Sequence, residues 1–406
     1  MVLIIKIYLT ITIILLAAVG AFCALYLITD KKLKQAQADN NTGIIAVGAS
    51  DIDPYYNLTS IPNFKNSHDG RILCIGDTNF IDGGSIQIGT RNVSATPYFF
   101  TTLLNNVFNV PYTSQNFFGS DSSSFDTRVV TDRFGFDSYP ASNIGLGGRC
   151  YAATNSAASI IFTPDDDVRG ATVEVYALQS SANFTLTMGT NSPITVNPSA
   201  LAPVSGTIVK YSTTYNGLLQ TPAIKITATS ATTSKPVQIF GLACRVSGSR
   251  DVINGSYTPL TTTAITTSTH PTSILTAGAL ALNPSLVIIK LGASDYVSNY
   301  VGTTGVTTQD QYVNNMIAIV QFFKSKNIEV LVVLPEWTNG MDATAQTSWS
   351  TALKSALNSN AVAYYDFQAD MISLQKQIDA NVSNNSGSLN ILGSMRMAQG
   401  IIAATA

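Results

Sequence analysis

The chain has 406 residues, of which 45% are hydrophobic and 11% are charged, and its formal net charge is −2. This length allows two or three domains, each able to bury its own core. The charge balance excludes the basic field that gathers a nucleic-acid backbone, and the apolar fraction excludes extended disorder. The polar remainder, mainly Ser, Thr, Asn and Gly, is typical of secreted β-rich proteins and surface proteins.

The N-terminal segment 7–29 contains no charge and is long enough to cross a bilayer as one helix. Because this apolar run exceeds that of a usual signal peptide, we expect an uncleaved transmembrane anchor with the lipid bilayer as its partner. Lys6 precedes the segment and a lysine cluster at 31–34 follows it, so the orientation of the anchor stays open. The expected localisation is a single-pass membrane protein of a cell or virion surface.

A polar, weakly periodic segment, residues 30–69, follows the anchor and indicates a stalk or connector, since prolines at 54 and 62 interrupt any long helix. The four cysteines are too few for a disulfide scaffold. Whether Cys150 and Cys244 are bonded across a sheet stays open, as does the glycosylation of seven N-x-S/T sequons.

The character of the chain changes at Arg71, where RILCIGD is a short apolar run that ends in Gly-Asp. This pattern predicts a buried parallel strand that carries a loop to the top of a sheet. A domain is therefore expected to begin at residue 70, and its first part to extend to residue 125.

Between residues 126 and 247 the chain shows strand after strand with no helical period, including SIIFTP, ATVEVYAL and PVQIFGLACRV, spaced by Gly, Pro, Asn and Ser turns. This texture predicts an antiparallel β-sandwich. We expect the sandwich to be a compact insert whose two ends lie close together, because the flanking segments must complete one sheet.

From residue 248 to residue 406, strands and helices alternate. The strands are SLVIIK, EVLVVL and AVAYYDF, and the helices between them are DQYVNNMIAIVQFFKSKN and ATAQTSWSTALKSALNSN. Such alternation implies a parallel sheet covered by helices on both faces. The predicted fold class is therefore α/β, split by an all-β insert and preceded by a transmembrane helix.

Three motifs resemble the sequence blocks of the SGNH (GDSL-type) hydrolases in their order: a strand ending in GDT, a later strand ending in LGASD, and a final Gly-containing helix. The segment GLGGRCYA, followed by IIFTP and KPVQIFGLACRV, resembles the jelly-roll insert of phage-associated members. The resemblance covers residues 71–406. It implies a flavodoxin-like, three-layer parallel sheet with a jelly-roll insert.

Active members of this family use a Ser in GDS as nucleophile, an Asp-x-x-His pair near the C-terminus, and oxyanion donors from a Gly and an Asn. The resemblance places Thr78 at the nucleophile position and Gly255 and Ser294 at the oxyanion positions. It places Leu392 and Met395 where the Asp and His belong. Apart from the glycine, which would act through its backbone, all of these positions therefore carry a side chain that differs from that of active members.

The loss of the acid-base pair is expected to abolish the chemistry, since Leu and Met carry no titratable proton. The chain has two histidines, His68 and His270, and neither is a natural substitute. A nonstandard base would have to be Lys290, Asp77 or Asp295, although both aspartates also suit a structural capping role. The sequence thus predicts a pseudoenzyme.

We therefore expect a membrane-anchored, non-catalytic surface or virion protein that binds a glycan or a protein partner, with a minor capsid or host-attachment role. The ligand-binding candidates are Asp77, Thr78, Asn79, Ser294 and Asp295. Two alternatives stay open: an esterase or deacetylase acting on acylated cell-surface polysaccharide, and an architectural membrane-to-shell linker. The sequence has no zinc spacing and no phosphate loop, so no metal or cofactor is expected. The oligomeric state stays open.

Overall fold

The chain divides into two compact units, Met1–Asp53 and Pro54–Ala406, and everything described below belongs to the second. The computed structural model describes the following residues: 55–56, 70–77, 87–88, 91–92, 117–119, 129–131, 137–139, 150–164, 167–246, 250–256, 261–266, 278–300, 308–381, 383 and 389–405. Within them, no helix combines the length and the apolar character needed to cross a membrane. The predicted anchor, residues 7–29, lies outside them, and its role stays a prediction.

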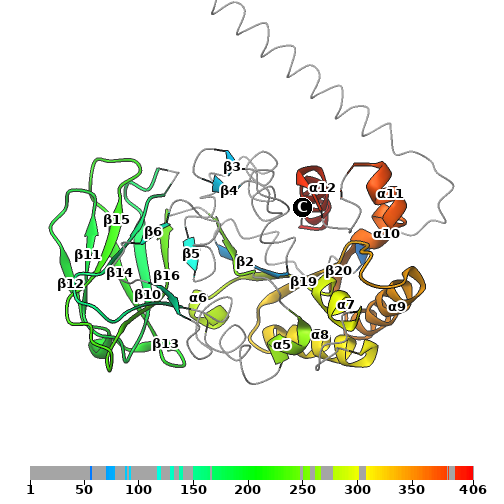
Figure 1. Ribbon diagram of the computed structural model, residues 1–406, viewed down its shortest axis with the longest axis horizontal. Helices are drawn as coiled ribbons and strands as arrows, with labels where there is room; N and C mark the ends of the chain where they lie inside the picture. The colour runs from blue at the N-terminus through cyan, green and yellow to red at the C-terminus, as the bar shows by residue number, and fades with distance from the viewer. Residues whose placement is uncertain are drawn as a thin grey trace, which may run out of the picture. The chain divides into compact units, whose positions relative to one another are not determined.

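A six-stranded sheet in the order β1-β20-β19-β18-β2-β17 forms the α/β part of the chain (Figure 1). The strands are β1 (Tyr55–Tyr56), β2 (Gly70–Gly76), β17 (Arg250–Asn254), β18 (Leu286–Lys290), β19 (Glu329–Leu334) and β20 (Ala363–Asp366). From β20 to β17 all neighbours pair in parallel, whereas β1 pairs antiparallel at the edge. The prediction of an α/β fold built on a parallel sheet is confirmed.

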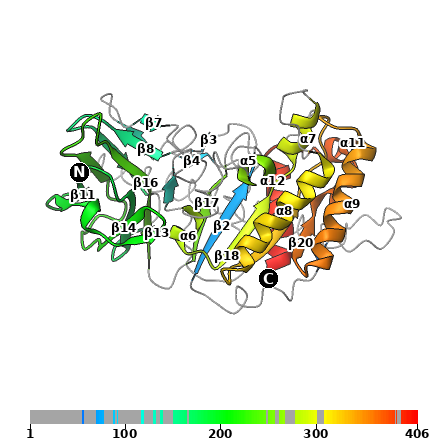
Figure 2. The same cartoon turned by 90° about the horizontal axis from the view of Figure 1, so that it is seen from below.

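Every residue of β18 and β19 is buried, because helices cover both faces of the sheet (Figure 2). The helices of this part are α5 (Thr262–Thr266), α6 (Ala279–Leu282), α7 (Ala293–Tyr300), α8 (Gln309–Lys324), α9 (Ala343–Ser359), α10 (Phe367–Met371), α11 (Leu374–Asp379) and α12 (Ile391–Thr405). A capping box at Thr308 and the carboxylate of Asp342 satisfy the first backbone donors of α8 and α9.

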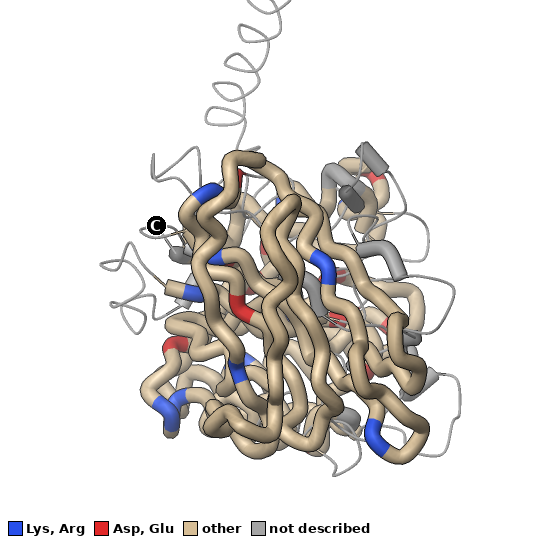
Figure 3. The backbone as a smooth tube through the Cα atoms, turned by 90° about the vertical axis from the view of Figure 1, so that its left-hand side faces the viewer, with Lys and Arg blue, Asp and Glu red and all other residues tan. Residues whose placement is uncertain are grey.

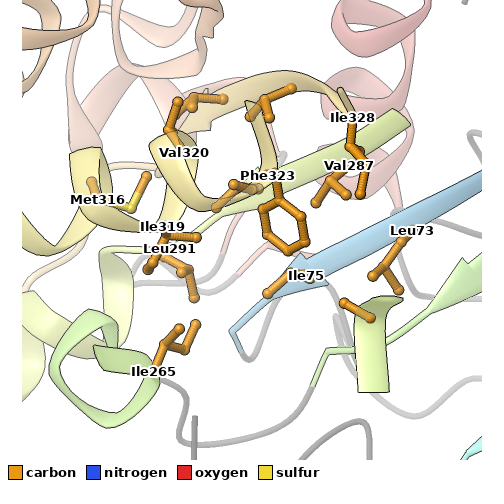
Figure 4. Close-up of a cluster of buried hydrophobic side chains, with 14 of the residues drawn as sticks. Leu73, Ile75, Ile265, Val287, Leu291, Met316, Ile319, Val320, Phe323 and Ile328 are labelled. Carbon is orange, nitrogen blue, oxygen red and sulfur yellow. The ribbon is translucent and has the colours of Figure 1, made fainter. Parts of the chain in front are cut away.

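The two faces of β2 contribute to two separate cores, because successive strand residues point to opposite sides. Leu73 and Ile75 pack with α8, where Phe323 fills the space beside them (Figure 4). Ile72 and Cys74 pack on the other side with residues of α12. Each face buries apolar side chains at about 25 cal/mol per Å², which is the main stabilising contribution to this sheet.

The second part of the fold consists of two antiparallel sheets. One has the order β13-β14-β10-β16-β8-β7, with β5 also paired to β16, and the other has the order β12-β11-β15-β9-β6. The bounds are β5 (Phe117–Gly119), β6 (Val129–Thr131), β7 (Asp137–Tyr139), β8 (Cys150–Ala153), β9 (Ser159–Phe162), β10 (Thr172–Leu178), β11 (Phe184–Met188), β12 (Ile194–Val196), β13 (Pro203–Ser205), β14 (Ile208–Thr214), β15 (Ile224–Ala228) and β16 (Val237–Arg245).

A single apolar cluster joins both antiparallel sheets, with Val175 and Leu242 from one and Phe184 and Ile226 from the other. Charged residues are few along these strands and lie scattered rather than gathered (Figure 3). The arrangement agrees with two sheets packed over one core. The jelly-roll connectivity and the limits at residues 126 and 247 stay predictions. The strand β5, which precedes residue 126, belongs to the same sheet as β16.

A buried ionic network centred on Arg71 connects β2 with the antiparallel strand β10. Its guanidinium donates to the hydroxyl of Tyr176 at 2.6 Å and to Asp251 Oδ2 at 3.3 Å, and it pairs with Glu174. Lys210 Nζ contacts the other oxygen of Glu174 at 3.0 Å. Burial opposes ionisation of Glu174, but the two cations outweigh it and hold the pKa of this carboxyl below its usual value.

Two cysteine side chains are among those described, and both are buried. The side chain of Cys150 lies outside the described ones, so whether Cys150 and Cys244 are bonded stays open. Cys74 is a free thiol, as expected of a small apolar side chain in a strand that is covered on both faces.

Candidate functional site

Three of the residues suggested by the sequence lie at the carboxyl ends of three neighbouring strands, β18, β2 and β17. Asp77 directly follows β2, Gly255 directly follows β17, and Ser294 lies in α7 after β18. Parallel strands carry their carboxyl ends to one edge of the sheet, which is where α/β proteins build their sites. Residues far apart in the sequence therefore become neighbours at this edge.

Asp77 is fixed by three hydrogen bonds and is fully buried. Its Oδ1 accepts from Lys290 Nζ at 2.6 Å, and its Oδ2 accepts from the backbone N–H of Ser294 at 3.1 Å. Its own N–H donates to the carbonyl of Lys290 at 3.2 Å. The carboxylate thus ties the end of β2 to the start of α7.

Lys290 also contacts a second carboxylate, that of Glu336, which lies just past the end of β19. Nζ lies 2.8 Å from Glu336 Oε2 and 3.1 Å from Oε1. Lys290 and Asp77 have no exposed side-chain surface, and that of Glu336 is 1% exposed. The ammonium of Lys290 therefore forms ion pairs with two carboxylates that are shielded from solvent. We call Asp77, Lys290 and Glu336 the buried triad.

Burial and neighbouring charge shift the pKa of two residues in the buried triad, Lys290 and Glu336. Burial alone would lower the pKa of Lys290, but Asp77 and Glu336 outweigh this effect and raise it above its usual value. Burial raises the pKa of Glu336, partly offset by Lys290. Lys290 consequently stays protonated near neutral pH and has no free electron pair to serve as a general base.

Asp295 has a structural role in the described part of the chain. Its buried carboxylate accepts from the N–H of Thr262 at 3.1 Å and from the Thr262 hydroxyl at 2.7 Å. Asp295, which lies in the first turn of α7, thereby satisfies a donor at the start of α5.

The two oxyanion positions have their backbone donors engaged. The N–H of Gly255 donates to the carbonyl of Cys74 at 2.8 Å, which extends the pairing of β17 with β2. The N–H of Ser294 is the one held by Asp77, and the Ser294 side chain is half-buried. A role of either residue in stabilising an oxyanion stays a prediction. The N–H of Gly255 already donates to a carbonyl, which argues against its use as an oxyanion donor.

The remaining candidates lie partly outside the described residues. Thr78, the next residue in the chain after Asp77, lies outside them, as do Asn79, His68 and His270. Leu392 is in α12, where its side chain is not among those described.

Met395, also in α12, is half-buried. Gly400 of the same helix faces the ring of Tyr365 so closely that a Cβ there would collide with it. The glycine noted in the final helix is therefore required by packing.

The segment that follows β19 was not anticipated from the sequence. Gln377 of α11 accepts from the N–H of Trp337 at 3.1 Å and donates to the Trp337 carbonyl at 3.0 Å. Gln346 of α9 makes the same kind of pair with the backbone of Thr338, accepting at 3.1 Å and donating at 2.5 Å. We call these two residues the glutamine clamps, since they fix the backbone next to Glu336.

Glu336 itself was also missed, although the sequence carried a signal for such a partner. A lysine inside the apolar run LVIIKL is buried if the run is a central strand, and a buried ammonium requires a carboxylate. Among the described residues, no group of three or more His, Cys, Asp and Glu side chains is arranged to hold a metal ion.

No protein-family model matches the chain, and no curated protein matches it in sequence. The structure is similar to that of a peptidoglycan O-acetylesterase, with a TM-score of 0.58 and 13% identity over 87% of this chain and 94% of that chain. The fold is that of the SGNH hydrolases. Other solved structures are less similar and cover a smaller share of this chain.

The weaker matches include proteins from several bacteria. A G-D-S-L family lipolytic protein from Desulfitobacterium hafniense is 17% identical over 38% of this chain and 81% of that chain, with a TM-score of 0.32. A catalytic mutant of an acetylxylan esterase from Geobacillus stearothermophilus is 15% identical over 39% of this chain and 74% of that chain, with a TM-score of 0.33.

The expectation of a non-catalytic binding protein is wrong in the light of the likeness to the peptidoglycan O-acetylesterase, which agrees instead with the esterase alternative. That expectation rested on the identities of single side chains, those at positions 78, 294, 392 and 395. The likeness instead covers 87% of this chain. Neither the described residues nor the similar structures support a pseudoenzyme, virion or capsid role.

Proposed function

We propose that this protein is an esterase that removes acyl groups from an acylated cell-surface polysaccharide. The observation that carries the proposal is the hydrogen bond from the Ser294 N–H to Asp77 Oδ2 at 3.1 Å. It joins the strand end that precedes Thr78 to the residue at an oxyanion position, at the carboxyl edge where SGNH-fold enzymes carry out their chemistry. The similarity in fold to a peptidoglycan O-acetylesterase supports this substrate class.

The proposed reaction is acyl transfer through the Thr78 hydroxyl. Its oxygen attacks the ester carbonyl, the carbonyl oxygen becomes an oxyanion, and the sugar oxygen leaves with a proton. Water then hydrolyses the acyl-threonine and releases the carboxylic acid. A threonine hydroxyl serves as a nucleophile in other enzyme classes, so the extra methyl group does not exclude this role.

In this proposal, the general base that accepts the proton of the Thr78 hydroxyl is not a member of the buried triad. Lys290 is protonated, and both oxygens of Asp77 already accept hydrogen bonds. The carboxylate of Asp295 is engaged with Thr262. The two histidines of the chain, at 68 and 270, are therefore the residues to test for this role.

The test is acetate release from O-acetylated peptidoglycan by the full chain, with acetylated xylan as a second substrate. We expect release by the wild type, loss of release in Thr78→Ala, and retained release in Thr78→Ser. His68→Asn and His270→Asn, measured across pH, identify the base by loss of the corresponding limb of the pH profile. Acetate release that is unchanged in Thr78→Ala, or absent from the wild type on both substrates, overturns the proposal.

We further propose that residues 7–29 anchor the enzyme in a membrane, so that it acts on polysaccharide beside the bilayer. The uncharged, bilayer-length segment supports this localisation. In the same proposal the antiparallel sheets form a jelly-roll insert, residues 126–247, between two halves of the SGNH part at 70–125 and 248–406. A glycan partner for this insert fits the substrate class.

A further inference from the structure

On the basis of the proposed esterase function, we infer that Lys290 is a positioning residue. Held by Glu336, it fixes the carboxylate of Asp77, and through that carboxylate it fixes the start of α7 at Ser294. Lys290 touches no reacting atom in this role. It acts through Asp77, which precedes the nucleophile position in the chain.

The strand order makes this role feasible. Lys290 ends β18, and β18 lies between β2 and β19 in the sheet. Its ammonium therefore meets a carboxylate on each side, Asp77 at 2.6 Å and Glu336 at 2.8 Å. Because these groups are almost completely shielded from water, solvent does not replace a lost contact, and each contact constrains geometry strongly.

Within the part of the chain that the structure describes, the carboxylate of Asp77 has one donor for each oxygen. Lys290 Nζ holds Oδ1 and the Ser294 N–H is held by Oδ2, so the orientation of one side chain sets both contacts. Removing the ammonium leaves Oδ1 without the donor that sets the orientation of the carboxylate. The bond to Ser294 then depends on a side chain that is free to rotate.

Glu336 gives Lys290 a second fixed point. Glu336 lies two residues after the end of β19, and Gln377 pairs with the N–H and the carbonyl of the next residue, Trp337. An ammonium has three donors and no acceptor, so two carboxylates on opposite sides define its position better than one. The raised pKa of Lys290 agrees with an ammonium that keeps its charge at this place.

The test compares three variants of the full chain. Lys290→Met removes the ammonium but keeps the length of the side chain. Lys290→Met combined with Glu336→Met also removes one unpaired carboxylate, which restores folding if the single variant is unstable. Lys354→Met is the matched control, because Lys354 Nζ contacts Asp366 Oδ2 at 2.7 Å at the end of β20, outside the buried triad.

Two readouts are used, acetate release and amide hydrogen exchange in peptides that contain Ser294. We expect both Lys290 variants to lower kcat by about 100-fold while KM changes by less than about twofold, because positioning affects the reacting geometry and not uniform binding. We expect exchange at Ser294 to accelerate in both Lys290 variants and to stay at the wild-type rate in Lys354→Met.

A double variant that folds and keeps both the wild-type kcat and the wild-type exchange rate at Ser294 overturns the inference, since Lys290 would then only balance buried charge. The two proposals fail in different ways. A wild type that releases no acetate refutes the esterase function. The exchange rates still decide whether Lys290 positions Ser294.

Discussion

Gly400 of α12 lies against the aromatic ring of Tyr365 in β20, at a distance that leaves no room for a Cβ atom. The final helix can approach the sheet this closely only because residue 400 has no side chain. The same tyrosine donates from its hydroxyl to Asp370 Oδ2 at 2.8 Å, so its ring cannot rotate away without losing a hydrogen bond.

Substituting Gly400 by Ala is therefore expected to destabilise the fold. Overpacking costs about 1–3 kcal/mol, and it opposes a gain of about 1 kcal/mol from the higher helix propensity of alanine. Urea unfolding of Gly400→Ala should show a net loss of stability. Gln399→Ala, at the exposed neighbour, should stay within about 0.5 kcal/mol of the wild type. A more stable Gly400→Ala would contradict the close approach.

Replacing Arg71 by Met should strongly destabilise the protein. The change leaves Glu174 and Asp251 as buried carboxylates without their shared cation, at a cost of about 3–5 kcal/mol. The matched control is Arg169→Met, since Arg169 pairs with Asp167 on an exposed turn, where solvent screens the ion pair and its contribution to stability is small. Equal losses in the two variants would show that the buried network adds no more to stability than the exposed ion pair.

The same network predicts a pH dependence with a definite sign. The pKa of Glu174 is lower in the folded state than in the unfolded state, so its contribution is fully present above the unfolded pKa, about 4.3. That contribution is lost as the pH falls through the folded pKa. The stability difference between wild type and Glu174→Gln should therefore shrink as unfolding is measured at successively lower pH below 4.3.

Glu336 should show the opposite dependence. Its pKa is raised in the folded state, so the native protein holds a proton that the unfolded chain releases above a pH of about 4.3. The stability associated with that proton is present below the unfolded pKa and is lost as the pH rises through the folded pKa.

Glu336→Gln removes this titration, while its amide oxygen still accepts from Lys290. The stability of this variant relative to the wild type should rise with increasing pH, by at most about 1.4 kcal/mol per pH unit. Unfolding free energies from pH 4 to 8 test the sign, and a relative stability that falls with increasing pH would contradict it.

Loss of a glutamine clamp should cost more than loss of an exposed glutamine on the same helix. Gln377→Met leaves the buried N–H and carbonyl of Trp337 without partners, at about 1–3 kcal/mol for each group. Gln375→Met removes only an exposed contact with Asp379 and should stay within about 0.5 kcal/mol of the wild type. Similar effects of the two changes in thermal unfolding would exclude a clamping role for Gln377.

Local pattern was sufficient for much of the fold. The apolar run before Asp77 predicted a buried parallel strand, and the alternation of strands and helices after residue 248 predicted the layered sheet. Both follow from periodicity within short segments, because burial of one face or of both faces leaves a repeating signature in the sequence. The order of the blocks also indicated the SGNH fold correctly.

The site was decided by tertiary structure. From the sequence, Lys290 was a candidate only for a nonstandard base. The strand order β2-β18-β19 instead gives it two carboxylate partners, from residues 213 and 46 positions away in the chain. These two carboxylates keep Lys290 charged. Likewise, the sequence does not reveal that the N–H of Gly255 donates to the carbonyl of Cys74. That hydrogen bond depends on the pairing of β17 with β2. Hydrophobic pattern records whether a residue is buried, but the identity of its partners depends on which strands become neighbours, and no local pattern contains that information.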